Sequence, residues 1–408
     1  MKTLYRRVAG IDVHRVKHVA TILIEQADGS TEAHTREFGG FKRDLRWLVA
    51  WLQRYAVELV VMESTSIYWK SLYAHLERAG IEAWVVNAHH IKHVPGRKTD
   101  LGDARWLAEL GRFGLVRGSF IPPQDLRELR LIARYRHKLS GTLAGEKNRL
   151  HKVLDDAGIK LGAVVSDISG VSAQAMLAGL LGGEEPNALI ELAKGRLKAK
   201  REELQLALDG ELSARHLFLL QSLQGHIRQL QAQLDELDGY LIAAMAPYRW
   251  AWELLQTIPG IDAIAAALIL VEIGEDMHRF GSADRLASWA ALCPGNHESA
   301  GKRQSGKTRK GNSLVRYLLC EAANAARRTK TVFASKYQGL VIRRGHKKAI
   351  VALAHKLIRT IYVILSRREP YRDSGTDYQA AAVSNNAPRW IRALKQFGYW
   401  PTQTPVTA

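Results

Sequence analysis

Cysteine is scarce in this chain, and long apolar runs are absent. Cys293 and Cys320 are the only cysteines among 408 residues. Two such residues, far apart and outside any CxxC pair, exclude a disulfide scaffold and a structural zinc site, and they fit a reducing compartment. The most apolar stretch, residues 258–273, contains Asp262 and Glu272. We therefore expect no membrane span.

The N-terminal segment also lacks the pattern of a secretory signal. Basic residues occur near its start, but Asp12 and His14 interrupt the apolar segment that follows. A signal peptide needs a continuous apolar h-region. We therefore expect a cytoplasmic protein without a signal peptide.

Acidic residues are outnumbered by basic ones. The chain has 59 Lys and Arg against 40 Asp and Glu, a net charge of +19. Fourteen of the basic residues and a single acid, Glu321, fall within residues 301–350. Because 47% of the chain is hydrophobic, we expect a folded protein. The excess of basic residues indicates a polyanionic partner, usually nucleic acid. No Walker loop, dinucleotide-binding fingerprint or nucleophile elbow is present.

The first part of the chain alternates between strand and helix patterns. Residues 8–113 predict the order strand, strand, strand, helix, strand, helix, strand, helix, with Asp28-Gly29 as the first hairpin turn. A hairpin meander followed by helical crossovers predicts an α/β domain with a mixed sheet and helices packed on it. Because Pro122-Pro123 marks a boundary, we place this domain at residues 1–122.

Helical patterns dominate the remainder. We expect a helical, coiled-coil linker and oligomerisation domain at residues 123–250, a mainly α-helical domain at 251–370 and a loosely ordered tail at 371–408. In the linker, apolar residues recur at alternating spacings of three and four, a heptad seam typical of a coiled coil or a helix hairpin. The seam comprises Leu220, Leu223, Ile227, Leu230, Leu234, Leu237 and Leu241.

Four carboxylates stand where strands and a helix begin or end. Asp12 and Glu63 lie near the ends of predicted strands, and Asp100 and Asp103 are three residues apart where a helix opens. Carboxylates that converge from such positions can bind two divalent cations, Mg²⁺ or Mn²⁺, which take oxygen ligands and promote phosphoryl transfer. Each acid taken alone also fits a strand-end turn, ordinary loop chemistry or a helix N-cap.

A loop rich in Gly, Ser and basic residues precedes the last predicted helices. Within it, the Ser299 hydroxyl can act as a nucleophile on phosphorus or simply bind a phosphate oxygen. The cations of this region suit a nucleic-acid backbone, although a solvated surface turn also explains a charge run. The candidate nucleic-acid contacts are Lys302, Arg303, Lys307, Arg309, Lys310, Arg316, Arg343, Arg344, Lys347 and Lys348.

A further candidate contact is the turn Ile258-Pro259-Gly260-Ile261, which lies between two helical segments. In a helix-hairpin-helix motif, the backbone N–H groups of the turn around Gly260 face a phosphate. A plain Pro-Gly turn between helices explains the same residues.

Several of these blocks, in this order, resemble a known family. The chain resembles the DEDD transposases of the Piv-invertase type, the recombinases of bridge-RNA-guided insertion sequences, over about residues 8–365. The blocks that carry the resemblance are Gly10-Ile11-Asp12-Val13, Met62-Glu63-Ser64-Thr65, Lys98-Thr99-Asp100-Leu101-Gly102-Asp103-Ala104-Arg105, Ile258-Pro259-Gly260-Ile261, Glu298-Ser299-Ala300-Gly301 and Lys310-Gly311-Asn312.

The resemblance implies both a fold and a chemistry. It implies an RNase H-like (RuvC-like) first domain whose metal site is Asp12, Glu63, Asp100 and Asp103. It also implies a C-terminal transposase domain in which Ser299 attacks DNA to form a phosphoserine link. Ala300 replaces the family's usual glycine after that serine, so Ser305 stays open as the nucleophile.

The resemblance also implies partners. They are donor and target DNA, a structured bridge RNA and further copies of the chain in a dimer or tetramer, with acids and serine from different subunits. The place of action is the bacterial cytoplasm, at the nucleoid.

Three functions stay open at this point. The first is a DNA recombinase with the carboxylates as metal ligands and Ser299 as nucleophile. The second is a RuvC-like metal-dependent nuclease or resolvase that cuts branched DNA with water. The third is a non-catalytic nucleic-acid-binding protein whose carboxylates are structural. The motif blocks favour the first.

Overall fold

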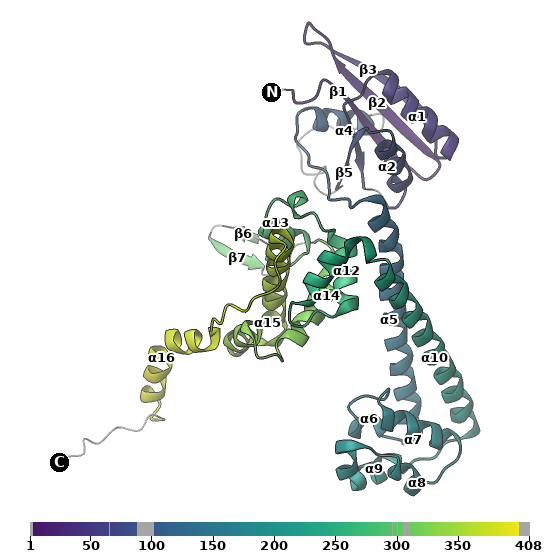
Figure 1. The fold of residues 1–408 in the computed structure, drawn as a ribbon, viewed down its shortest axis with the longest axis vertical. Coiled ribbons are helices and arrows are strands. Elements are labelled where there is room, and N and C mark those ends of the chain that lie inside the picture. The colour runs from purple at the N-terminus through teal and green to yellow at the C-terminus, as the bar shows by residue number, and fades with distance from the viewer. Residues whose placement is uncertain are drawn as a thin grey trace, which may run out of the picture. The chain divides into compact units, whose positions relative to one another are not determined.

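The chain divides into two compact units, Met1–Gln124 and Asp125–Ala408. The computed structural model describes residues 3–64, 66–87, 102–295, 297–299, 301–305, 308 and 310–399. Figure 1 labels most of the elements of both units.

The N-terminal unit is built on a five-stranded mixed sheet of order β3-β2-β1-β4-β5. Strand β2 is antiparallel to β1 and β3, whereas β4 is parallel to β1 and β5. The mixed sheet and the predicted order of elements are therefore confirmed. The elements are β1 (Arg7–Val13), β2 (Lys17–Glu25), β3 (Thr31–Gly39), α1 (Lys42–Arg54), β4 (Leu59–Glu63), α2 (Trp69–Arg78), β5 (Glu82–Val86) and α4 (Asp103–Arg112).

Alternation along the strands divides the sheet between two cores. Ala9 and Ile11 of β1 pack in a cluster with the leucines of α1 and α2. Val8 of β1 and Val61 of β4 pack in a second cluster with the leucines of α4. Helices α1 and α2 therefore cover one face of the sheet, and α4 covers the other.

Gly10 sets how closely α4 approaches the sheet. A Cβ atom at Gly10 would overlap the carbonyl oxygen of Ala104 and lie 2.5 Å from the backbone N of Ala108. Both obstacles belong to the backbone of α4, so no side-chain rotation can relieve the overlap. The glycine of the first sequence block is therefore explained by helix–sheet packing.

We expect Gly10→Ala to lower the free energy of unfolding by about 3 kcal/mol, because the added methyl must push α4 away from β1. Chemical denaturation followed by circular dichroism measures the change. The control is Gly141→Ala, on an exposed helical position where a Cβ meets nothing within 4 Å. That variant should be unchanged or slightly stabilised, and equal stability of both variants would contradict the packing argument.

The C-terminal unit begins with two long antiparallel helices. Helices α5 (Gln124–Asp156) and α10 (Ala214–Ala243) pack through Leu139, Leu143, Leu230 and Leu234. Arg136 of α5 binds Asp238 of α10 through two hydrogen bonds of 2.7 and 2.8 Å. The connection between the two helices folds into a small apolar cluster against the end of α5 and the start of α10. Its elements are α6 (Leu161–Val164), α7 (Val171–Leu181), α8 (Pro186–Glu191), η2 (Gly195–Lys200) and α9 (Arg201–Leu208).

The predicted leucine seam lies on the buried side of α10. Leu220 and Leu223 enter the cluster formed with α6 to α9, and Leu230 and Leu234 contact α5. The seam leucines therefore pack against other helices of the same chain, and α5 and α10 form a helix hairpin with a long insert. Its expected role in oligomerisation stays a prediction.

The rest of the C-terminal unit is mainly helical, as predicted. Helix α12 is almost wholly buried, and α15 is kinked at Gly345, whose φ is +71°. Helix α15 is long and apolar enough to cross a membrane, but half of its most apolar window is buried within the protein, as in a core helix. The elements are η3 (Ala246–Tyr248), α11 (Arg249–Gln256), α12 (Ala263–Ile273), η4 (Met277–Arg279), α13 (Ala283–Trp289), β6 (His297–Ser299), β7 (Lys302–Ser305), α14 (Ser313–Ala326), α15 (Val332–Arg367) and α16 (Tyr378–Gln396).

The C-terminal tail differs from the expectation of loose order. Residues 378–396 form helix α16, because an alanine-rich start favours a helix and the Asp377 side chain accepts a hydrogen bond from Ala380 N at 3.0 Å. The Lys356 side chain of α15 also holds the first residue of α16, Tyr378. Residues 400–408 lie outside the described residues.

Candidate active site

Asp12 and Glu63 occupy matching positions on neighbouring parallel strands. Ile11 of β1 pairs with Met62 of β4, so the next residue on each strand is a carboxylate. Both acids are half-buried at the carboxyl ends of their strands. In a sheet with parallel strands, polar side chains at this edge are typical of functional sites.

The two acids face the side of the sheet that α4 covers. Side chains alternate along a strand, so Asp12 shares a face with Val8 and Gly10, and Glu63 shares it with Val61. These three neighbours pack against α4. Helix α4 begins with Asp103, directly before Ala104, which lies over Gly10. The structure therefore brings Asp12, Glu63 and Asp103 to one region of the sheet.

These acids suit a hard divalent cation by donor type and placement. Carboxylate oxygens are the ligands that Mg²⁺ prefers, and three of them come from two strand ends and one helix start. Within the described ranges, no three His, Cys, Asp or Glu side chains come close enough together to hold a metal ion. Asp100, the fourth predicted ligand, lies outside those ranges.

A histidine next to the acids was missed by the sequence analysis. His14 Nε2 lies 2.9 Å from Asp12 Oδ2. Nearby, His18 is 3% exposed, and burial lowers its pKa. The spacing of His14 two residues after Asp12 was a visible signal, because residues two apart along a strand share one face of the sheet.

Ser299 lies at the tip of a two-stranded antiparallel hairpin, opposite Lys302. Gly301, with a φ of +73°, is in the turn. Ser305 lies at the other end of the hairpin, opposite His297. The two candidate serines therefore occupy opposite ends of one hairpin.

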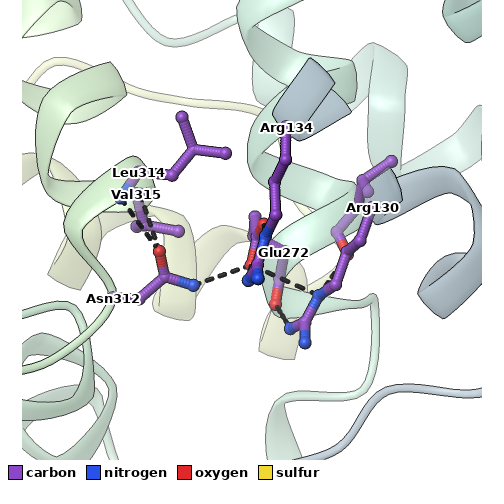
Figure 2. A network of polar contacts seen from close by, with 7 residues as sticks. Arg130, Arg134, Glu272, Asn312, Leu314 and Val315 are labelled. Atoms are coloured by element: carbon purple, nitrogen blue, oxygen red, sulfur yellow. Dashed lines mark hydrogen bonds and ion pairs between the residues drawn. The ribbon is translucent and has the colours of Figure 1, made fainter. Parts of the chain in front are cut away.

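The segment that follows this hairpin is fixed by a buried polar network (Figure 2). Asn312 caps α14 by accepting from the backbone N of Leu314 and Val315, each at 3.1 Å. Its amide nitrogen donates to Glu272 at 2.7 Å. Gly311 lets the chain run close to α13, because a Cβ there would lie 2.5 Å from Trp289 O. The Lys310-Gly311-Asn312 block thus anchors the C-terminal side of the serine hairpin.

Glu272 is fully buried and is held by two arginines of α5. Arg134 forms two hydrogen bonds with it, of 2.9 and 3.2 Å, and Arg130 lies 3.2 Å away. Burial lowers the pKa of Arg130 to about 10, and the charge of Glu272 opposes that change. This network was not predicted from the sequence, although a lone acid inside the apolar run 263–273 was a visible signal.

The predicted nucleic-acid contacts fall into three groups. Lys302 and Arg303 are in β7, whereas Lys307 and Arg309 lie outside the described residues. Lys310 and Arg316 are exposed. Exposed cations also flank the kink of α15 at Gly345, and these are Arg343, Arg344, Lys347 and Lys348.

Gly260 sits in the predicted turn between α11 and α12. Its φ is +87°, and a Cβ there would overlap Ala322 O and lie 2.7 Å from Ala326 N of α14. Asp262 caps α12 by accepting from Ala265 N at 2.8 Å. Close packing on α14 therefore explains the glycine, and a phosphate contact at this turn stays a prediction.

Comparison with known proteins identifies the family. A DEDD transposase model of the IS110 type matches residues 9–159, and a model described as "Transposase IS116/IS110/IS902 family" matches residues 252–338. The transposase for insertion sequence element IS1111A of Coxiella burnetii is 28% identical over 307 residues, which cover 72% of this chain and 74% of that protein. The probable family 20 transposase of Pseudomonas aeruginosa is 26% identical over 322 residues, which cover 77% and 86%.

Two further similarities cover smaller parts of the chain. The pilin gene-inverting protein of Moraxella lacunata is 30% identical over 143 residues, which cover 34% of this chain and 44% of that protein. The structure of RuvC from Thermus thermophilus aligns with 28% of this chain and 99% of its own, at 15% identity and a TM-score of 0.23. Together the two family models match more than half of the 408 residues, and the chain belongs to the IS116/IS110/IS902 family of transposases, enzymes of DNA recombination.

Proposed function

We propose that this transposase cuts and exchanges the DNA strands of an insertion sequence, with Asp12, Glu63, Asp100 and Asp103 as ligands of divalent cations and Ser299 as the nucleophile. The N-terminal unit acts as an RNase H-like domain in this proposal. The observation that carries it is the matched placement of Asp12 and Glu63 on β1 and β4, on the face where α4 begins with Asp103.

The charge of the protein supports this assignment. Carboxylates repel phosphodiesters, so an acidic edge in a chain of net charge +19 needs cations between it and DNA. Bound Mg²⁺ or Mn²⁺ would stabilise the charge that develops on the reacting phosphate. The protein's own part is to hold the carboxylates at fixed positions, which the strand pairing and the Gly10 packing provide.

Ser299 would make the covalent link to DNA. Its Oγ forms a bond to phosphorus while the bond from phosphorus to the leaving strand oxygen breaks. The hydroxyl proton leaves to solvent, and the released strand end takes up a proton. A hydroxyl of a second strand then replaces the serine, so that one phosphodiester is exchanged for another. The position of Ser299 at a hairpin tip, opposite Lys302, supports this role because a tip can approach a backbone phosphate closely.

Partners follow from the same proposal. Donor and target DNA are the substrates, and a structured bridge RNA selects them in the bacterial cytoplasm. The active form is a homo-oligomer, a dimer or tetramer. The excess of positive charge supports two polyanionic partners.

We expect Ser299→Ala to abolish strand exchange and the covalent protein–DNA adduct, because no hydroxyl then stands at the hairpin tip. Ser305→Ala is the matched control, since it removes the same atom from the other end of the hairpin. Denaturing gel electrophoresis of labelled DNA after reaction with Mg²⁺ measures the adduct. Native exchange by Ser299→Ala would overturn the serine assignment, and cleavage without any adduct would favour a nuclease that uses water.

A further inference from the structure

A second basic site, outside the predicted nucleic-acid contacts, lies where α15 meets the segment that leads into α16. A cavity of about 640 Å³ opens there, a volume that suits a small ligand or part of a larger one. Five Lys and Arg side chains line it against one carboxylate, Glu369. The cations are Lys336, Lys356, Arg359, Arg367 and Arg372.

Two of these cations converge on one aromatic ring. The Nζ atoms of Lys336 and Lys356 lie 5.5 and 4.9 Å from the ring centre of Tyr378. Lys356 also donates a hydrogen bond of 3.1 Å to the Tyr378 hydroxyl. Burial lowers the pKa of Lys336, and the positive charges of Lys356 and Arg359 lower it further. The cavity therefore holds partly desolvated positive charge.

The carboxylates near the cavity, Glu369, Asp373 and Asp284, offset only part of the charge of its five cations. Asp373 accepts hydrogen bonds from the backbone N of Val332 and Gly375, at 2.9 and 2.8 Å, so it fixes the shape of the wall. Asp284 pairs with Arg359 at 3.4 Å. Among the described residues, neither Lys336 nor Lys356 forms an ion pair with an acid.

The neutral groups of the cavity also suit an anion with several oxygen atoms. Burial lowers the pKa of His355, with Arg359 and Lys336 adding to the effect, so its ring is neutral at pH 7 and can still donate one N–H. Arg and Lys together with neutral donors are the usual partners of phosphate oxygens.

We infer that this cavity binds backbone phosphates of a nucleic acid, either the DNA or the RNA partner. The inference rests on the proposed function, in which both polyanions bind the chain, and adds a contact site to it. Lys336 and Lys356 contact the phosphate, and Tyr378 keeps the two ammonium groups together when the site is empty.

The test compares the binding of a fluorescein-labelled duplex DNA and a labelled single-stranded RNA of the same length. The full-length double variant Lys336→Ala, Lys356→Ala should weaken binding of one probe by about tenfold or more and reduce the slope of log K against log salt by about two. The probe that loses affinity identifies the source of the phosphate. The control removes two exposed lysines, Lys152→Ala with Lys198→Ala, and should change binding by less than about threefold.

Two further variants separate charge from folding. Lys336→Arg with Lys356→Arg keeps both charges and should bind as the wild type does. Arg372→Gln changes an exposed side chain of the cavity wall and should weaken the same probe even if the double alanine variant is unstable. The inference is overturned if the alanine and Arg372 variants bind both probes no worse than the control pair.

The test of the cavity can fail or succeed independently of the test of the proposed function. Strand cleavage by the wild type and its loss in Asp12→Asn test the chemistry, whereas the cavity variants are measured by binding alone. Normal binding by the cavity variants of an active enzyme defeats only this inference. Cavity-dependent binding by a protein that cuts no DNA defeats only the proposed chemistry.

Discussion

Replacing Asp12 with Asn, or Glu63 with Gln, is expected to lower the rate of DNA strand cleavage by about a thousandfold or more, because bound divalent cations supply several kcal/mol of charge stabilisation to a phosphoryl transfer. Each change removes one negative charge from the pair of acids at the ends of β1 and β4 and keeps the size of the side chain. Single-turnover cleavage of labelled element DNA in Mg²⁺ measures the rate, and titration calorimetry with Mg²⁺ measures the loss of metal binding.

The control is an exposed carboxylate of the same sheet, two strands away from Asp12. Glu37 is exposed on β3, where it pairs with Lys17 at 3.1 Å. Glu37→Gln should cleave at the native rate, since exposed ion pairs contribute little. Asp103→Asn and Asp100→Asn should behave like Asp12→Asn. Native activity of the Asp12 and Glu63 variants would show that the carboxylates are structural.

The second large effect concerns the buried network around Glu272. Glu272→Ala is expected to lower the free energy of unfolding of the C-terminal unit by about 3–5 kcal/mol, because it leaves buried positive charge without its partner. Most of the cost falls on Arg130, whose side chain is 16% exposed, while that of Arg134 is 52% exposed and regains water. The variant also removes the acceptor of the Asn312 amide. Urea denaturation followed by circular dichroism measures the change.

Two variants show whether burial causes this loss. Glu272→Gln keeps an acceptor oxygen for Asn312 and should cost less than Glu272→Ala. Glu253→Ala breaks an ion pair of 2.7 Å with Arg249 on an exposed helix surface, and it should change stability by less than about 1 kcal/mol. A loss as small for Glu272→Ala as for Glu253→Ala would mean that the network contributes little.

Local patterns explain why the sheet and the strand-end positions of Asp12 and Glu63 were predictable. The alternation of strands and helices predicted the mixed sheet, and the positions of Asp12 and Glu63 after apolar strand residues predicted their place at its edge. Strand periodicity assigns a side chain to a face only when the register is known. The pairing of Ile11 with Met62 therefore had to come from the structure.

Other features depend on contacts between distant segments. The seam of α10 did not reveal that its partner is α5 of the same chain, because a heptad pattern is the same for partners within and between chains. Glu272 and Arg134 are 138 residues apart in the sequence. Local sequence patterns cannot predict a contact over such a separation. The helix at 378–396 was not predicted, because the polar composition of the tail was taken to indicate loose order. The alanine-rich segment that begins this helix was the signal for it.

The most direct measurement is the identity of the residue that carries DNA during strand exchange. The wild-type enzyme would be reacted with element DNA and divalent cation, denatured and digested, and the peptide that carries a nucleotide located by mass spectrometry. We predict that the modified residue is Ser299 and that Asp12→Asn yields no modified peptide. A nucleotide on Ser305 or on any other residue, or exchange that proceeds without a modified peptide, would contradict the assignment.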